Sequence, residues 1–224
     1  MKSSENGGAS PRLLTPENCV LLLIDHQPQM AFATRSIDGQ TLVNNVTGLA
    51  KSAKVFGVPT ILTTVAAESF SGPIFSPVQA VYPNLKPIDR TTMNAWEDRR
   101  VVDAVRKTGR KKLVMAALWT EVCLATAALS ALDDGFEVHI VTDASGGVTV
   151  EAHETAVQRM IHAGVVPMTW WLQVLLEWQR DWARQGTYDA VLAVAREHGG
   201  AYGLGIDYAK AMLGGHASEC SLAA

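Results

Sequence analysis

Short apolar runs of strand length alternate along this chain with longer segments in which apolar residues recur at a helical period. The apolar runs predict strands at residues 20–24, 58–65, 112–118, 137–142 and 165–168. The periodic segments predict helices at residues 42–56, 97–108, 120–134, 151–163 and 170–184. Several of these helices are followed by a glycine of the kind that closes a helix, namely Gly57, Gly109, Gly135 and Gly164.

The predicted strands are apolar on both faces, and helices separate them. Such strands are typical of a parallel sheet that is covered by helices on both sides. The sequence therefore predicts an α/β fold, a three-layer α/β/α sandwich with a mostly parallel sheet. Ligands of such sheets bind at the carboxyl ends of the strands, so polar residues at those positions are the first candidates for a site.

The chain divides into a leader, one domain and an extension. Residues 1–11 are polar and predict a flexible leader, and no linker divides residues 12–184, which predict a single domain. Residues 185–224 predict a helical extension, with helices at 188–198 and 202–213, that contacts other subunits. The connection 66–89 has four prolines and little periodicity, which is typical of a functional loop or an arm between subunits.

Charge is scarce in this chain. Only 18% of its residues are charged, against about 25% in a usual soluble domain, so part of the surface is expected to be buried in a homo-oligomer. The net charge of −3 and the lack of a basic cluster argue against nucleic acid or anionic lipid as a partner. The polar start and the absence of an apolar stretch of about 20 residues predict a cytoplasmic protein and no membrane contact.

The three cysteines, Cys19, Cys123 and Cys220, are an odd number at wide spacing. This pattern suits neither a disulfide framework nor a zinc site, so at least one cysteine is a candidate for a reactive thiol. Cys123 lies near the start of the helix after strand 112–118. A helix start favours a thiolate there. The alternative is that Cys123 is a small residue of the apolar core, which is the commoner role of a free cysteine.

Asp25 ends the apolar run 20–24. A carboxylate at that point either has a functional partner or caps a loop. If Asp25 faces Cys123 across the edge of the sheet, it could accept the proton of the thiol, and the two would form a nucleophile and its base.

Four stretches carry a resemblance to a known family. They are VLLLIDHQ at 20–27, MNAWEDRRVVDAV at 93–105, LWTEVCLATAALSALDDGFEVHIVTDASGG at 118–147 and MTWWLQVLLEWQRDWAR at 168–184. Together they resemble the isochorismatase-like cysteine hydrolases, most of all the YcaC-type branch. The resemblance covers about residues 14–213 and implies a Rossmann-like sheet of six strands, no cofactor and a homo-oligomer, a tetramer or an octamer.

The resemblance also implies roles for individual residues. Asp25 matches the family's base and Cys123 its nucleophile. Arg90, six residues before Trp96, stands where the family has a lysine, and an arginine stays charged where a lysine can release a proton.

The resemblance further implies a cis peptide bond at Leu118–Trp119. The amides of Trp119 and Cys123 would then form an oxyanion hole, and Gln27 would help to bind the substrate. Nicotinamidases of this superfamily bind a divalent ion through an Asp-x-His and a further His, and the corresponding stretch 63–73 lacks this set. We therefore expect no metal.

Two further features have ordinary explanations beside functional ones. Residues 145–147 could form an anion-binding nest or a plain tight turn. A stripe at helical spacing indicates core or subunit contact more than a substrate platform, and consists of Trp170, Val174, Trp178 and Trp182.

The sequence thus predicts a cysteine-dependent hydrolase that acts on a small amide-like C–N bond through a thioester. The alternative is a non-catalytic oligomeric protein that binds a small ligand at a vestigial site, with Arg90 as the mark of lost chemistry.

Overall fold

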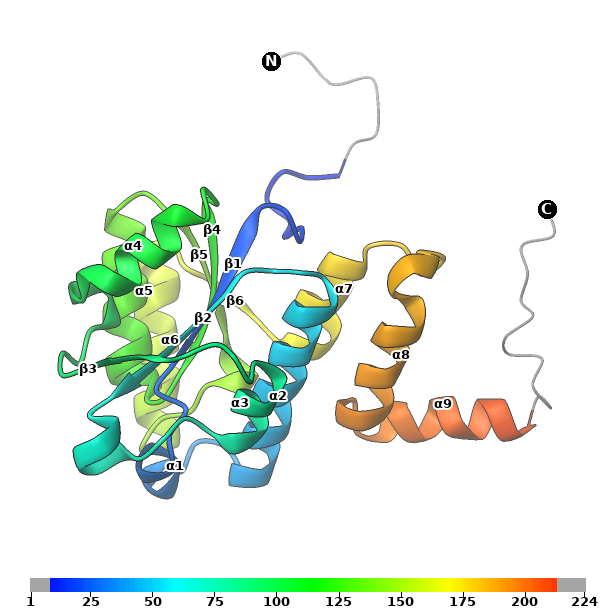
Figure 1. Ribbon diagram of the computed structural model, residues 1–224, viewed down its shortest axis with the longest axis horizontal. Helices are drawn as coiled ribbons and strands as arrows, with labels where there is room; N and C mark the ends of the chain where they lie inside the picture. The colour runs from blue at the N-terminus through cyan, green and yellow to red at the C-terminus, as the bar shows by residue number, and fades with distance from the viewer. Residues whose placement is uncertain (1–8, 213–224) are drawn as a thin grey trace, which may run out of the picture.

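Six parallel strands form one sheet, in the order β3-β2-β1-β4-β5-β6 (Figure 1). The structure is a computed structural model, and it describes residues 9–212. The strands are β1 (Cys19–Ile24), β2 (Thr60–Val65), β3 (Ile88–Arg90), β4 (Lys112–Ala117), β5 (Glu137–Val141) and β6 (Val166–Met168). Helices cover both faces of the sheet, which confirms the predicted three-layer α/β/α sandwich.

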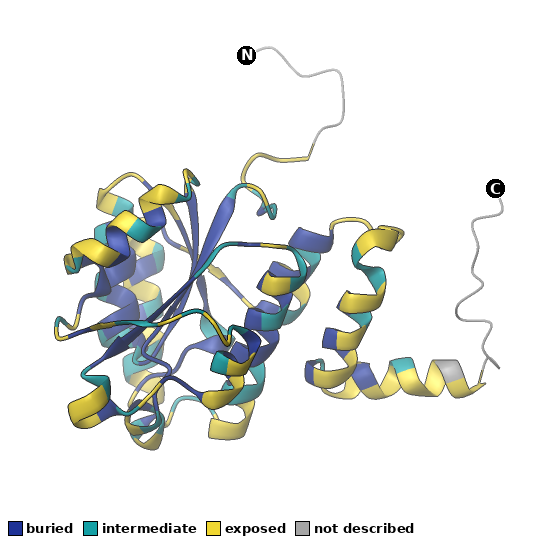
Figure 2. Ribbon diagram, in the orientation of Figure 1, coloured by how far each residue is buried: buried dark blue, intermediate teal, exposed yellow. Residues whose placement is uncertain are grey.

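The central strands serve two cores at once because successive side chains of a strand point to opposite faces. In β1, Leu21 and Leu23 join the first core, whereas Val20, Leu22 and Ile24 join the second. The first core includes residues of α1 (Pro28–Ala33), α2 (Gly39–Val55), α3 (Ser76–Val81) and α7 (Leu175–Gln179). The second includes residues of α4 (Arg99–Lys107), α5 (Ala125–Asp133) and α6 (Val150–Ala163). Figure 2 shows the buried sheet between these two layers.

Local sequence signals set the ends of the longer helices. The side chains of Asp38, Asp98 and Thr149 accept hydrogen bonds from the first turns of α2, α4 and α6. The glycines predicted to close helices all have positive φ, a conformation that favours glycine, at Gly57, Gly109, Gly135 and Gly164.

The prediction for the connection 66–89 was wrong in one respect, because that segment contains regular structure. It includes the π-helical turn η1 (Ala67–Ser71), helix α3 and the start of β3. Strand β3 is only three residues long and contains Asp89 and Arg90, so it carries no apolar run. It pairs with β2 at the edge of the sheet and brings Arg90 to the carboxyl end.

The helix predicted at 170–184 is shorter in the structure. It consists of the π-helical turn η5 (Trp170–Val174) and α7, and it ends where Arg180 adopts a φ of 60°. Trp170, Val174 and Trp178 of the predicted stripe are buried in the first core, whereas Trp182 is exposed.

Two helices follow this segment, α8 (Gln185–His198) and α9 (Ala201–Met212). Helix α8 packs against α2, and α9 extends from α8 away from the sheet (Figure 1). Among the described residues, no helix combines the length and the apolar character needed to cross a bilayer. Residues 1–8 of the predicted leader, Cys220 and the rest of the end of the extension lie outside the described residues.

Candidate active site

Three residues predicted from the sequence meet at the carboxyl edge of the sheet. Asp25 follows β1 directly, Arg90 ends β3, and Cys123 lies in the π-helical turn η3 (Thr120–Leu124) after β4. All three are buried, with Cys123 2% exposed. The structure thus brings together the base, the cation and the thiol that the sequence singled out separately.

Asp25 and Arg90 form a buried ion pair. Arg90 Nη2 lies 2.5 Å from Asp25 Oδ2, and the side chains are 1% and 0% exposed. Thr63 of β2, which lies between β1 and β3, donates from its hydroxyl to Asp25 Oδ1 at 3.4 Å. Burial raises the pKa of Asp25, and the charge of Arg90 limits that rise.

The rest of the Arg90 guanidinium is held by the chain that follows β3. Nη1 donates to the carbonyl oxygens of Thr92 and Met93. Nε is buried and has no hydrogen-bond partner among the described residues. Arg90 is therefore fixed in place and retains one donor that a bound molecule could use.

The thiol of Cys123 lies beside the carboxylate of Asp25, and each group affects the pKa of the other. Burial, and secondly the negative charge of Asp25, raises the pKa of Cys123 to about 12. Arg90 and the backbone amide of Trp119 act in the opposite direction but do not outweigh burial. Burial therefore favours the neutral thiol, against the expectation that the helix start favours a thiolate.

The turn before Cys123 has the cis peptide bond at Leu118–Trp119 that the resemblance implied. The indole Nε1 of Trp119 donates to the carbonyl oxygen of Met30 in α1 at 2.9 Å. The backbone amide of Trp119 faces the sulfur of Cys123 and lowers the pKa of that thiol. An amide in this place can donate to a negatively charged oxygen that develops near the sulfur.

Gln27, which was expected to help bind the substrate, is buried and bonded to the backbone after β2. Its Oε1 accepts from the N–H of Val65 at 2.9 Å, and its Nε2 donates to the carbonyl oxygens of Val65 and Gly72. Both polar atoms of the amide are therefore used in joining β1 to the segment after β2. This arrangement holds the edge of the site together.

The loop after β5 supports the cysteine turn from the other side. Gly146 accepts from the N–H of Thr120 at 2.9 Å, and Ser145 accepts from the N–H of Ala117 at 3.1 Å. The N–H groups of Gly147 and Val148 donate to the side chains of Ser36 and Glu121. Because protein groups occupy these donors, the loop is a tight turn and not an open anion nest.

Sequence reasoning missed three polar residues around the site. Thr63 is β-branched and is indistinguishable from an ordinary strand residue in the run 58–65. Buried His26 bonds through Nε2 to the carbonyl of Ala144, and burial lowers its pKa to about 4. Thr120 bonds through its hydroxyl to Nδ1 of His153 in α6 at 2.8 Å.

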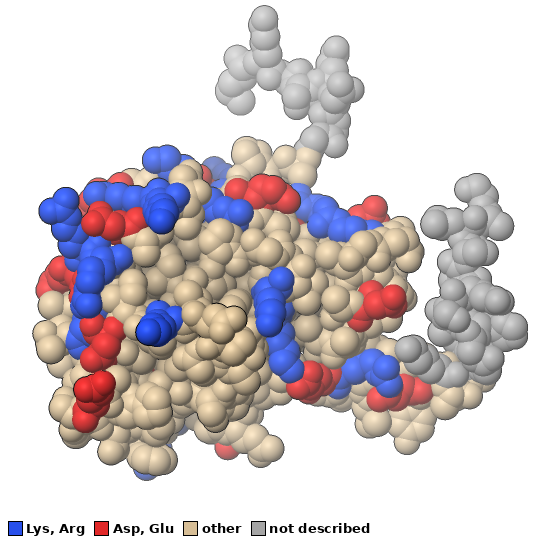
Figure 3. Space-filling view, in the orientation of Figure 1, with Lys and Arg blue, Asp and Glu red and all other residues tan. Residues whose placement is uncertain are grey.

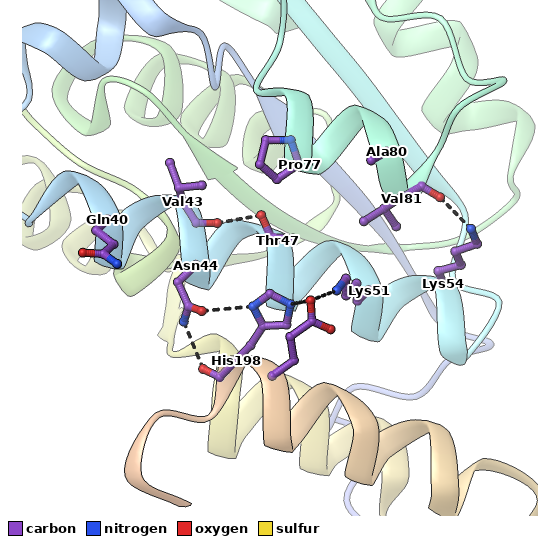
Figure 4. Close-up of a pocket in the computed structure, with 11 residues that line it drawn as sticks. Gln40, Val43, Asn44, Thr47, Lys51, Lys54, Pro77, Ala80, Val81 and His198 are labelled. Carbon is purple, nitrogen blue, oxygen red and sulfur yellow. Dashed lines mark hydrogen bonds and ion pairs between the residues drawn. The ribbon is translucent and has the colours of Figure 1, made fainter. Parts of the chain in front are cut away.

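The described residues show no candidate metal site, and the cavity beside α8 is separate from the three central residues. The described part of the chain holds no group of three or more His, Cys, Asp and Glu side chains that could bind a metal ion. A cavity of about 610 Å³ between α2, α3 and α8 is lined by polar residues such as Asn44, Lys51 and His198 (Figure 4). None of the three central site residues lines it.

The fold and this site define a class: an α/β protein with a buried Asp, Arg and Cys constellation at the carboxyl edge of a parallel sheet. The isochorismatase domain model matches residues 19–171, so the chain belongs to the isochorismatase family. It is 40% identical over 170 residues to the probable hydrolase YcaC of Escherichia coli, a match that covers 75% of this chain and 81% of that protein.

Two solved structures are similar to the whole described fold. The crystal structure of YcaC from Escherichia coli, an octameric hydrolase of unknown specificity, has a TM-score of 0.86 and 35% identity, with 92% of this chain and 100% of that chain covered. The structure of YcaC from Pseudomonas aeruginosa with hexane-2,5-diol and covalent acrylamide has a TM-score of 0.84 and 34% identity, with 90% and 98% covered. Both confirm the YcaC-type resemblance and the isochorismatase-like fold.

Proposed function

We propose that this protein is a cysteine-dependent hydrolase of a small molecule with an amide-like C–N bond. The observation that carries the proposal is the buried ion pair of Asp25 and Arg90 beside the thiol of Cys123, at the carboxyl edge of the sheet. A nucleophile in contact with its base, and a base oriented by a third group, is the arrangement that nucleophilic catalysis requires.

In the first step Asp25 accepts the proton of the thiol, and the sulfur attacks the carbonyl carbon of the substrate. Because the pKa of Cys123 is raised to about 12, the thiol loses its proton to Asp25 while the new S–C bond forms. The amides of Trp119 and Cys123 donate to the oxyanion that develops on the carbonyl oxygen.

In the second step Asp25 returns the proton to the leaving nitrogen, the C–N bond breaks, and a thioester remains on Cys123. Asp25 then accepts a proton from water, the water oxygen attacks the thioester, and the acid product leaves as the sulfur regains its proton. One carboxylate thus moves the proton in each half of the reaction.

Arg90 orients the base and does not move protons. It remains charged throughout, so it keeps Asp25 in one rotamer and stabilises the negative charge while that charge passes from carboxylate to sulfur. Gln27 acts as a positioning residue in this proposal, because its amide is bonded to the backbone of Val65 and Gly72.

The test is amine release from a library of amides, ureides and hydroxamates. Wild-type protein should release amine from at least one compound, and Cys123→Ala should lose that activity. Cys220→Ala is the control, since it removes a thiol that the proposed mechanism does not use. Full activity in Cys123→Ala would refute the mechanism.

A second candidate is a non-catalytic protein with a vestigial site. The departure from the family's lysine at Arg90 and the nearly complete burial of Cys123 favour it. It predicts that Cys123 reacts with iodoacetamide no faster than Cys220 and that Asp25→Asn changes nothing. The hydrolase predicts a strong dependence of that rate on Asp25.

We further propose that the protein is a homo-oligomer of at least four chains. Helix α9 supports this, because its large apolar side chains are exposed by 50–80%, at Tyr202, Leu204, Tyr208 and Met212. The similar YcaC of Escherichia coli is octameric. Light scattering should give a mass of four or more chains, and Leu204→Lys with Tyr208→Lys should lower it; a wild-type monomer at micromolar concentration would contradict the proposal.

A further inference from the structure

The segments that directly follow the strands at the carboxyl edge of the sheet carry carboxylates and no Lys or Arg. We define the edge segments as the seven residues that follow each strand, at 25–31, 66–72, 91–97, 118–124, 142–148 and 169–175. They contain no Lys or Arg, and their acidic residues are Asp25, Glu68, Glu97, Glu121 and Asp143. The summed charge of these segments therefore repels an anion that approaches the site.

The charge of Arg90, which ends β3, is already compensated. Its guanidinium is paired with Asp25 at 2.5 Å, and both side chains are buried. A substrate carboxylate would add a negative charge that no free cation of the edge segments could balance. The unpaired Nε–H of Arg90 offers one hydrogen bond, which a neutral carbonyl oxygen can accept as well.

Burial increases this difference between neutral and anionic substrates. Cys123 is 2% exposed, so a substrate that reaches its sulfur must lose most of the water bound to the substrate. Loss of water is far more unfavourable for a carboxylate than for an amide. The connections after β1, β2 and β3 also present exposed apolar side chains, Phe32, Phe70 and Met93.

The distribution of charge over the molecule agrees with this picture. Figure 3 shows many Lys and Arg side chains in the upper left part of the view, around α4, and further ones over the middle. The lower end of this face, where α1 lies, is largely uncharged. On this face, most basic side chains therefore lie away from the lower end.

We infer that this site selects neutral small molecules, such as primary or secondary amides without a carboxylate, and excludes carboxylate substrates. The inference rests on the proposed function and names its substrate class. It assigns the selection to the compensated Arg90 and the acidic edge segments.

Iodoacetamide and iodoacetate test the inference, because they are nearly the same size and differ in charge. In both reactions the sulfur of Cys123 bonds to the CH₂ carbon as iodide leaves. Rates at Cys123 are measured by peptide mass spectrometry and divided by the rates with free glutathione. We expect the ratio of the iodoacetamide rate to the iodoacetate rate to be more than tenfold higher at Cys123 than in glutathione. Equal ratios for Cys123 and glutathione would overturn the inference.

A matched pair of variants locates the cause. Glu68→Lys changes an exposed carboxylate of the edge segments, and Glu17→Lys changes an exposed carboxylate just before β1, at the opposite edge. At low ionic strength Glu68→Lys should raise the iodoacetate rate severalfold and Glu17→Lys should leave it unchanged. Equal effects of the two variants would overturn the assignment to the edge segments.

This experiment is separate from the test of catalysis. Alkylation needs only the thiol and access to it, so charge selection can be measured even if no amide is hydrolysed. Failure of the proposed function appears instead as amine release that persists in Cys123→Ala.

Discussion

Arg90 Nη2 lies 2.5 Å from Asp25 Oδ2, and neither side chain reaches solvent. The pair joins the end of β3 to the end of β1 across β2, which lies between them in the sheet. A buried ion pair of this kind contributes little net stability, but removal of one partner leaves a charge without compensation. The pair therefore makes the fold depend on both of its members at once.

Arg90→Met should lower the free energy of unfolding by about 3–5 kcal/mol, because it leaves the Asp25 carboxylate buried and unpaired. The double variant with Asp25→Asn should recover most of that loss. Urea denaturation of wild type, both single variants and the double variant measures the coupling. Additive effects of the two substitutions would show that the ion pair is not energetically coupled.

Asp25→Asn should lower both the rate of hydrolysis and the pKa of Cys123. Hydrolysis should fall more than about a hundredfold, because the base is lost. The pKa of Cys123 should fall, because the negative charge of Asp25 raises it and Arg90 would then act alone. Alkylation by iodoacetamide at a series of pH values should therefore reach half its maximal rate at lower pH than in wild type; a shift to higher pH would contradict the geometry.

His26 should make the fold sensitive to mild acid. Its pKa in the folded protein is lowered to about 4 by burial, whereas an unfolded histidine titrates near 6.5. As the pH falls below 6.5, His26 binds a proton in the unfolded chain but stays neutral in the folded chain. The free energy of unfolding should therefore fall by roughly 2 kcal/mol between pH 7 and pH 5. Urea denaturation should show this loss in wild type and less of it in His26→Asn, whereas His162→Asn, at an exposed position, should behave like wild type.

Gly48 of α2 has no room for a side chain. A Cβ at this position would lie 2.6 Å from the buried ring of Trp170, so Gly48→Ala should lower the free energy of unfolding by about 1–3 kcal/mol. Gly39 begins the same helix and has nothing within 4 Å, so Gly39→Ala is the control and should be neutral or slightly stabilising. Thermal denaturation of both variants should separate close packing from helix propensity.

The sequence predicted the layers and five of the six strands because their apolar runs are long enough to recognise. Strand β3 was missed, since Ile88 is its only apolar residue and its partner β2 supplies the pairing that defines it. Asp25 and Cys123 could be found because each lies just beyond an apolar strand, at the edge where ligands bind.

Other features of the site depend on contacts between distant parts of the chain. The place of Gln27 depends on Gly72, which is 45 residues away, so no local pattern could reveal it. The neutral state of Cys123 follows from burial, which outweighs the helix start that the sequence suggests. Local sequence signals thus identified the candidate groups of the site, and tertiary contacts shift their pKa values.

Every residue of β1 is fully buried, and the strand is paired on both sides. Its amide hydrogens should exchange with deuterated solvent only when the whole protein unfolds, so Asp25 is attached to the least mobile part of the fold. The opening that admits a molecule to Cys123 must therefore come from the other connections at this edge. The segments with Phe70 and Met93 follow β2 and β3 at this edge, and both side chains are exposed.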